Sequence, residues 1–319
     1  MIMKTRTAPN EIFVLTALLR RLPLRHKKRR LLEQNLAYYQ RGFDGEKAVD
    51  RFTSAILKNN FTILHDVYLD SAFQIDTLII SPHCIFVVEI KNYKGTLTLD
   101  YKLNQFTREE NGVITGFRNP ILQATTNTIL LTNWLAERNI HDIPTYPLFV
   151  ISDPRTIIKV IPENRDISGE VMHGEYMPQH VMKVDRGSPH GQLHQKVGAI
   201  ILRECGTYKF DYQRKYGIHS KDILGGVQCP GCGRLGMKRQ YNSWICEKCR
   251  VVSKTEHKQA LTDYFLLKKS WINNSECMQY LGITSKNLAT KVLREQGLGY
   301  DNYHRRWHVN ENQVNKTIV

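Results

Sequence analysis

The sequence predicts an α/β protein in which a mixed sheet flanked by helices is followed by a small cysteine-rich module and a helical module. Three observations lead to this prediction. Helical and strand-like segments alternate in the order αβββαβ between residues 45 and 152. Two CxxC pairs come after residue 228, and two short amphipathic helices around Gly282 follow them. A chain of 319 residues has room for two or three domains and a sizeable core.

The positive charge of the chain is concentrated at its two ends. The net charge is +15, and residues 41–220 contain twenty Lys/Arg and twenty Asp/Glu. Residues 1–40 contain nine Lys/Arg and two Asp/Glu, and residues 221–319 contain sixteen and eight. Basic ends around a neutral centre suggest a polyanionic partner such as nucleic acid. A basic surface that only keeps the protein soluble is the alternative.

The N-terminal part predicts a basic arm that runs into a helix. Its Arg20-Arg21 pair and the run Arg25–Arg30 could bind phosphates or an acidic membrane surface, or the arm could be mobile. The apolar run Ile12–Leu19 has its charges after it and no small-residue cleavage site, unlike a secretory signal. The sequence also has no run of 18 apolar residues, so we expect a cytoplasmic protein without a transmembrane helix.

Two acids and a lysine meet on a predicted antiparallel hairpin. Its strands are the apolar, β-branched segments Gln74–Ser81 and Cys84–Lys91, with two residues between them. Counting back from the turn places Asp76 opposite Glu89, and alternation places Lys91 on the same face as Glu89. Like charges at this distance repel each other. A divalent cation bound by the two carboxylates, with the lysine beside the substrate, would explain the pattern.

Further elements surround this hairpin. An amphipathic helix is expected from Gly45 to Asn59-Asn60 with Glu46 in its first turn, and a second helix begins at Asn119-Pro120 with Gln123 in its first turn. Taken alone, Glu46 could simply complement a helix dipole, and Gln123 could be a surface amide. The buried side expected for the second helix includes Ile121, Leu122, Thr125, Ile129, Leu130 and Trp134. The other strands expected are Phe61–Leu69, Thr96–Leu99, Tyr146–Ser152 and Ile157–Ile161.

Four segments carry a resemblance to a known family. They are Gly42–Glu46, Gln74–Asp76, Glu89–Gly95 and Asn119–Gln123. In order and spacing they resemble the nuclease-related domain (NERD) branch of the PD-(D/E)xK nucleases, over roughly residues 41 to 153. The resemblance implies a PD-(D/E)xK nuclease-like fold and metal-dependent hydrolysis of phosphodiester bonds.

The resemblance also implies roles for individual residues. Asp76 and Glu89, assisted by Glu46, would bind Mg²⁺ or Mn²⁺. Lys91 would stabilise the charge that develops on the phosphorus and would help to place the attacking water. Gln123 would orient water or phosphate.

Four cysteines predict a structural zinc site. Cys229 and Cys232 form one CxxC pair, and Cys246 and Cys249 form another thirteen residues later, with a hairpin expected at Gln240–Ile245 between them. This is a zinc-ribbon pattern, because four thiolates match tetrahedral Zn²⁺. Disulfides are the alternative, but a cytoplasmic location and an odd total of seven cysteines argue against them.

The C-terminal part resembles a helix-turn-helix. A short helix at Ser275–Leu281, a turn at Gly282 and a second helix at Ser285–Gln296 have the required order, and Tyr300–Val309 could form a wing. A helical hairpin that contacts other proteins is the alternative. The residues expected to bind nucleic acid are Lys286, Asn287, Thr290, Lys291, Arg294, Arg305 and Arg306.

We therefore expect four parts: a basic arm and helix (1–40), a NERD-like nuclease domain (41–220), a zinc ribbon (221–254) and a helix-turn-helix-like domain (255–319). The expected function is metal-dependent cleavage of DNA that the last two parts bind. The alternatives are a non-catalytic DNA- or RNA-binding protein that keeps the nuclease fold as a scaffold, and a basic adaptor for membrane surfaces or proteins. The sequence does not distinguish DNA from RNA or endonuclease from exonuclease, and it leaves the oligomeric state open.

Overall fold

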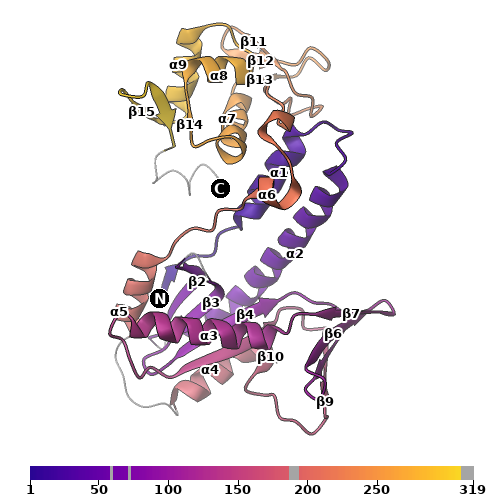
Figure 1. Ribbon diagram of the computed structural model, residues 1–319, viewed down its shortest axis with the longest axis vertical. Coiled ribbons are helices and arrows are strands. Elements are labelled where there is room, and N and C mark those ends of the chain that lie inside the picture. The colour runs from indigo at the N-terminus through magenta and orange to yellow at the C-terminus, as the bar shows by residue number, and fades with distance from the viewer. Residues whose placement is uncertain (58–59, 71–72, 187–193, 310–319) are drawn as a thin grey trace. The chain divides into compact units, whose positions relative to one another are not determined.

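The computed structural model describes residues 1–57, 60–70, 73–186 and 194–309 (Figure 1). They form two compact units. Unit 1 contains Met1–Ala8 and Gln40–Tyr208, and unit 2 contains Pro9–Tyr39 and the chain from Lys209 onward. The first forty residues are thus divided between the two units, whereas the sequence predicts a separate basic arm.

Unit 1 is built around a mixed six-stranded sheet with the strand order β1-β2-β3-β4-β8-β10. The pairs β1–β2, β4–β8 and β8–β10 are parallel, and β2–β3 and β3–β4 are antiparallel. This sheet confirms the expected α/β class. The strands are β1 (Ile2–Lys4), β2 (Thr62–Leu69), β3 (Phe73–Ile80), β4 (Ile85–Lys91), β8 (Thr145–Ile151) and β10 (Val171–His173).

The β3–β4 hairpin has the predicted register. Ile80 pairs with Ile85, and the ladder continues to Thr77 and Val88. The turn is closed where the Ser81 amide donates to the Cys84 carbonyl at 2.9 Å. The ladder ends there, one residue before Asp76 and Glu89, which the count from the turn places opposite each other.

Helices cover both faces of the sheet (Figure 1). The helix α2 (Arg29–Thr53) and α4 (Met177–Arg186) pack on one face, and α3 (Pro120–Ala136) and α5 (His194–Glu204) pack on the other. The predicted buried side of α3 is partly wrong. Leu122, Ile129 and Leu130 are exposed. The buried side of the helix is instead formed by Ala124, Asn127, Leu131 and Trp134, together with Pro120 and Leu135. Asn127 is buried because its amide donates to the Gln74 carbonyl at 2.8 Å.

The helix predicted to begin at Gly45 begins earlier in the structure, so its predicted start is also wrong. Gly42 and Gly45 lie inside one 25-residue helix that ends at Thr53, so Glu46 is in the middle of a helix and not in its first turn. Gly45 is needed for close packing, because a Cβ atom there would lie 2.4 Å from the Cβ of Asn92. The expected helix end at Asn59-Asn60 falls partly outside the described residues, since residue 59 is among those left out.

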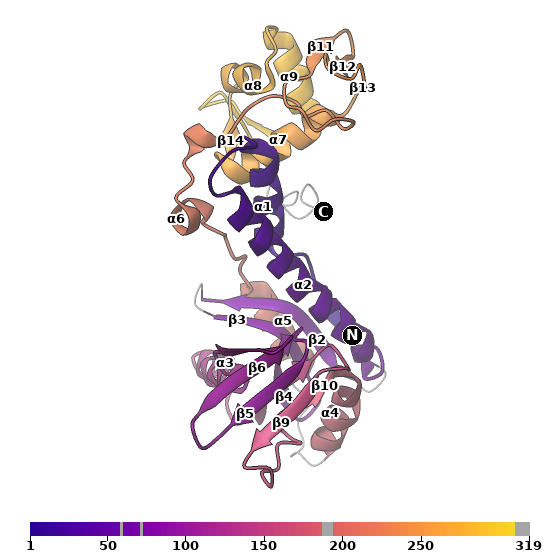
Figure 2. The same cartoon turned by 90° about the vertical axis from the view of Figure 1, so that its right-hand side faces the viewer.

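Unit 1 also contains a second sheet with the order β7-β6-β5-β9 (Figure 2). The strands β5 and β9 were expected, but the hairpin formed by β6 and β7 was not. Its two-residue loop is Asn111-Gly112, and both residues have positive φ, as a tight hairpin turn requires. The strands are β5 (Thr96–Asp100), β6 (Gln105–Glu110), β7 (Val113–Phe117) and β9 (Ile157–Ile161).

One of the buried cores of unit 2 runs through the cysteine-rich and helical modules. Trp244, Leu261, Cys277, Val292 and Trp307 belong to the same buried cluster. The two modules therefore share a core, although the sequence predicts two domains. The elements are α1 (Asn10–Arg21), α6 (Tyr212–Tyr216), β11 (Lys238–Gln240), β12 (Ser243–Ile245), β13 (Val252–Ser253), α7 (Glu256–Leu267), β14 (Trp271–Ile272), α8 (Asn274–Leu281), α9 (Lys286–Glu295), β15 (Gly299–Asp301) and β16 (Arg306–His308).

The arginine pair of the expected basic arm is used inside unit 2. Arg20 and Arg21 both bind the Asp263 carboxylate of α7, at 2.6 and 2.7 Å. Arg21 and Asp263 are completely buried. This pair therefore holds α1 against α7, and Arg21 is not exposed for phosphates, whereas the Arg20 side chain is 24% exposed. Among the described helices, none is long and apolar enough to cross a membrane.

Candidate functional site

Asp76, Glu89 and Lys91 lie together where β3 and β4 end their pairing. The Asp76 carboxylate accepts a hydrogen bond from the Ile90 amide at 2.8 Å, which fixes it against β4. The Lys91 ammonium donates to the Glu89 carboxylate. Glu89 is buried, whereas the Lys91 side chain is 27% exposed. The buried carboxylate of Glu89 is therefore paired with the partly exposed ammonium of Lys91.

A further acid, Asp66, lies opposite Asp76 on β2. The ladder pairs His65 with Thr77 and Val67 with Ile75, and the two aspartates face each other between these pairs. Asp66 has φ +53°, a left-handed conformation that aspartate tolerates better than most residues. The sequence reasoning missed Asp66, because its position depends on this local distortion of the strand.

Glu46 connects these strand residues to α2. Its carboxylate accepts a hydrogen bond from Arg6 at 2.7 Å, and its side chain is 20% exposed. The charges of Asp76, Arg6, Asp66 and Lys91 all act on its titration. The structure therefore brings Glu46 into the electrostatic environment of the hairpin acids, as the family resemblance implies.

Two of the acids are strongly perturbed. Burial and the charge of Asp76 raise the pKa of Glu46 to about 8, although Arg6 opposes the rise. Burial and the charge of Asp76 also raise the pKa of Glu89 to about 8, although Lys91 opposes it. Burial alone would lower the pKa of Lys91, but the charges of Asp76 and Glu89 outweigh it and raise that pKa. The cluster thus carries more negative charge than its own cations balance, which suits an additional cation.

Arg6 is the second residue that sequence reasoning missed. Its guanidinium is buried and binds Asp50 through two nitrogens, at 2.8 and 3.0 Å, as well as Glu46 and Asp66. Burial and the Arg6 charge lower the pKa of His65 to about 4, so this imidazole is neutral beside the guanidinium. Nothing near Arg6 in the sequence signals these contacts, since its partners lie 40 to 71 residues away.

Gln123 and Arg118 lie at the start of α3. The helix is capped by Asn119, whose side chain accepts from the Ile121 amide at 2.9 Å. The Gln123 side chain makes no hydrogen bond to the acids or to Lys91 in the described part of the chain. Arg118 is exposed, and its charge opposes the rise in the pKa of Glu89. Arg118 was missed although it directly precedes the Asn119-Pro120 segment.

The four cysteines of unit 2 form a tight cluster. The Sγ atoms of Cys229, Cys232, Cys246 and Cys249 all lie within 4.8 Å of one another, and none is in a disulfide. The Cys229–Cys249 and Cys232–Cys246 sulfur distances are 3.4 and 3.7 Å. Thiolates arranged tetrahedrally around Zn²⁺ at about 2.3 Å are about 3.8 Å apart. The cluster fits a zinc ribbon, and the predicted hairpin forms as β11 and β12.

In the described residues, these cysteines are the group whose ligand atoms gather closely enough to hold a metal without rearrangement. The carboxylates of Glu46, Asp76 and Glu89 form a looser group. The charge of Asp76 acts on the pKa values of Glu46 and Glu89, Arg6 donates a hydrogen bond to Glu46, and Lys91 donates one to Glu89. This arrangement reaches solvent at Lys91 and Glu46, whose side chains are 27% and 20% exposed.

The residues expected to bind nucleic acid have different surroundings. Thr290 donates to the Lys286 carbonyl and accepts from the Asn274 side chain at 2.6 Å, and Arg306 pairs with Asp301 at 3.4 Å and lies over the Trp271 ring. These two are held by other residues of unit 2. The five exposed residues are Lys286, Asn287, Lys291, Arg294 and Arg305.

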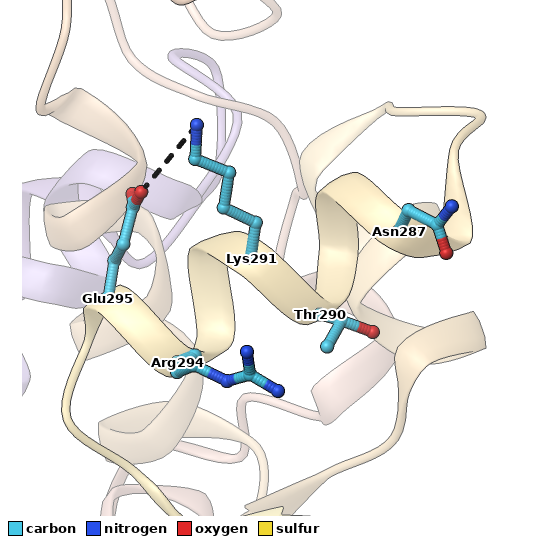
Figure 3. A pocket seen from close by; sticks show the side chains of 5 residues that line it. All are labelled: Asn287, Thr290, Lys291, Arg294 and Glu295. Carbon is cyan, nitrogen blue, oxygen red and sulfur yellow. Dashed lines mark ion pairs between the residues drawn. The ribbon is translucent and has the colours of Figure 1, made fainter.

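The outer face of α9 carries a shallow pocket, shown in Figure 3. Asn287, Thr290, Lys291, Arg294 and Glu295 line it. Lys291 lies 4.0 Å from Glu295, while Arg294 points away from this pair (Figure 3).

A mixed sheet with an acid–acid–lysine hairpin and a helix-borne glutamate defines a nuclease-related fold. Residues 41–152 match the family model of the nuclease-related domain (NERD), and this part of the chain is a nuclease-related domain. An uncharacterized protein of Bacillus anthracis is 31% identical over 104 residues, which cover 31% of this chain and 49% of that protein. The similarity thus spans about half the length of that relative. No solved structure gives a significant match.

Proposed function

We propose that this protein is a metal-dependent nuclease that hydrolyses phosphodiester bonds in DNA. The observation that carries the proposal is the placement of Asp76, Glu89 and Lys91 at one point of the sheet within a nuclease-related domain. Burial and the charge of Asp76 raise the pKa values of Glu89 in this group and of Glu46 on α2 to about 8. Buried acids with raised pKa values beside a lysine are characteristic of functional sites.

The acids have the chemistry that Mg²⁺ or Mn²⁺ requires. Asp76 and Glu89 would bind the cation as hard oxygen ligands, and Glu46 would assist from α2. When bound, the cation would polarise the scissile phosphate and lower the pKa of its water. Glu89 is held in place by Lys91, and Asp76 is held by the Ile90 amide.

The cationic side chains would act on the phosphate. The raised pKa of Lys91 keeps its ammonium charged, so it can stabilise negative charge that develops on the phosphorus. Arg118 is exposed close enough for its charge to act on Glu89, and it would bind a neighbouring phosphate. Gln123, on the first turn of α3, would orient water or phosphate in the role that the family resemblance implies.

Unit 2 would bind the DNA. The elements α7, β14, α8, α9, β15 and β16 follow one another in the order of a winged helix, and β14 and β15 both pair with β16. In this arrangement α9 is the recognition helix. Lys286, Lys291 and Arg294 are exposed on it, and the turn between β15 and β16 would be the wing, with Arg305 at its end. The Zn²⁺ held by the cysteines would stabilise the shared core.

The contacts of Arg20 and Arg21 with Asp263 remove only this pair from the basic-adaptor alternative, because Arg25, Lys27 and Arg30 are exposed.

Asp76→Ala and Lys91→Ala test the proposal in the full-length protein. Both variants should lose Mg²⁺-dependent cleavage of supercoiled DNA by at least about a hundredfold, since each removes a group of the reaction centre. Both should bind DNA with unchanged affinity, because the binding residues are in unit 2. If the wild type binds DNA but cleaves neither supercoiled, linear nor single-stranded DNA with Mg²⁺ or Mn²⁺, the scaffold alternative is correct.

A further inference from the structure

Arg6 lies outside the segment that matches the nuclease-related family, yet it contacts the candidate active site. The match covers residues 41–152, whereas Arg6 follows the short strand β1. Its side chain is 3% exposed and belongs to unit 1. A buried arginine that binds three acids is costly to desolvate, so these contacts require good geometry to be favourable.

The chain on both sides of Arg6 is fixed to the sheet. β1 pairs with β2, and the Lys4 ammonium donates to the carbonyls of His65 and Asp66 at 2.8 Å each. On the other side, the Thr7 amide donates to the Asp66 carboxylate at 3.1 Å. The backbone of residue 6 therefore has little freedom to move.

The guanidinium is oriented by the residues that do not belong to the reaction centre. Asp50 accepts from Nε and Nη2, in the bidentate geometry that a planar guanidinium favours. Nη2 also donates to the Thr77 hydroxyl at 2.6 Å. These contacts determine where the remaining nitrogen, Nη1, points.

Nη1 points to Glu46. It donates to Glu46 Oε2 at 2.7 Å and to Asp66 Oδ1 at 3.0 Å. The other oxygen of Glu46, Oε1, has no hydrogen-bond partner among the described residues, and the side chain is 20% exposed. Asp50 follows Glu46 by one turn of α2, so the same guanidinium holds two successive acids of one helix face.

We propose that Arg6 is the positioning residue that holds one oxygen of Glu46 so that the other is directed to the divalent cation. This inference rests on the proposed function, because it assigns Glu46 to the cation. Arg6 acts through Glu46 and does not itself touch the cation or the substrate. The nuclease site is therefore completed by residues 1–8, which precede the family segment.

A double-mutant cycle in the full-length protein tests the proposal. Arg6→Lys keeps the positive charge but cannot bind Asp50 and Glu46 in the same geometry. The affinity for Mn²⁺ is measured by calorimetry and by the electron paramagnetic resonance of free Mn²⁺, for the wild type, Arg6→Lys, Glu46→Gln and the double variant. Arg6→Lys should weaken Mn²⁺ binding about tenfold, as loss of a residue that orients a ligand typically does.

The Glu46→Gln background decides the outcome. If Arg6 acts through Glu46, Arg6→Lys has no further effect on Mn²⁺ affinity once Glu46 is Gln. An equal tenfold loss in both backgrounds would overturn the proposal, as would wild-type affinity in Arg6→Lys. Asp50→Asn provides a milder second change, because it loosens the orientation of Arg6 and leaves Arg6 and Glu46 in place. It should weaken Mn²⁺ binding only in the Glu46 background.

Arg21→Lys is the matched control. Arg21 is also buried, and it binds Asp263 and the Gly226 carbonyl in unit 2. Its substitution should lower thermal stability without changing Mn²⁺ affinity at the site in unit 1.

DNA cleavage by the same variants separates the two proposals. If the wild type does not cleave DNA but the Mn²⁺ cycle shows coupling, the nuclease function fails and the positioning role stands. If the wild type cleaves DNA and the cycle is additive, only the positioning role fails.

Discussion

Replacing Glu89 by Gln should stabilise unit 1 at alkaline pH in the absence of added Mg²⁺ or Mn²⁺. Glu89 is 1% exposed, and burial together with the charge of Asp76 raises its pKa from the ordinary value of 4.5 to about 8. Between these pH values the folded protein keeps a proton that the unfolded chain has lost. The free energy of unfolding therefore falls as the pH rises through this range.

The size of the effect follows from the two pKa values. They differ by about 3.5, and one unit corresponds to about 1.4 kcal/mol, so ionising Glu89 costs up to about 5 kcal/mol at pH 8.5. Glutamine avoids this cost, and the raised pKa already includes the favourable charge and hydrogen bond of Lys91. Glu89→Gln should therefore be more stable than the wild type by up to about 5 kcal/mol at pH 8.5. At pH 4.5 this advantage should disappear.

Hydrogen exchange of peptides from β3 and β4 measures the opening free energy of unit 1 separately from unit 2. Glu204→Gln is the matched control in the same unit, because hydrogen bonds from Arg138 and Arg203 lower the pKa of Glu204. It should show no gain at alkaline pH. A Glu89→Gln variant that is less stable than the wild type at pH 8.5 would refute the reasoning, because it would show that the ionised carboxylate is favoured in the folded protein.

Two further predictions concern unit 2. Cys232→Ser should lower the zinc content measured by atomic absorption. It should also lower the calorimetric melting temperature, because Trp244 joins the ribbon to the shared core. An unchanged melting temperature would contradict a structural zinc. Lys291→Ala and Arg294→Ala should each weaken DNA binding and reduce the slope of log affinity against log salt by about 1. Tyr241→Ala, on the β11–β12 loop, is the control and should keep the wild-type slope. A slope that stays unchanged in both charge variants would exclude α9 from the phosphate contacts.

The parts of the fold that follow from local rules could be predicted from the sequence. The β3–β4 register depends only on strand periodicity and a two-residue turn, so the pairing from Ile80 with Ile85 to Thr77 with Val88 could be counted from the sequence. The cysteine cluster follows from ligand spacing in the same way. The β6–β7 hairpin was missed although Asn111-Gly112 is a known signal for such a turn.

Other features depend on contacts between distant residues. Arg6 reaches Glu46 because a three-residue strand, β1, joins the edge of the sheet, and no sequence period reveals so short a strand. The two glycines before Glu46 predict a turn, but Gly45 instead allows α2 to pass close to Asn92. The core that the ribbon shares with the helical module contains a hydrogen bond from Trp244 to His257 at 3.1 Å, which joins two modules that look separate in the sequence.

The most direct test of the central claim is cleavage of supercoiled DNA by the full-length wild type and by Glu89→Ala, each with Mn²⁺ and with EDTA. We predict that the wild type cleaves with Mn²⁺ and not with EDTA, and that Glu89→Ala, although it binds the same DNA equally well, cleaves with neither. Equal cleavage by the two proteins would contradict the assignment of the active site to the β3–β4 hairpin.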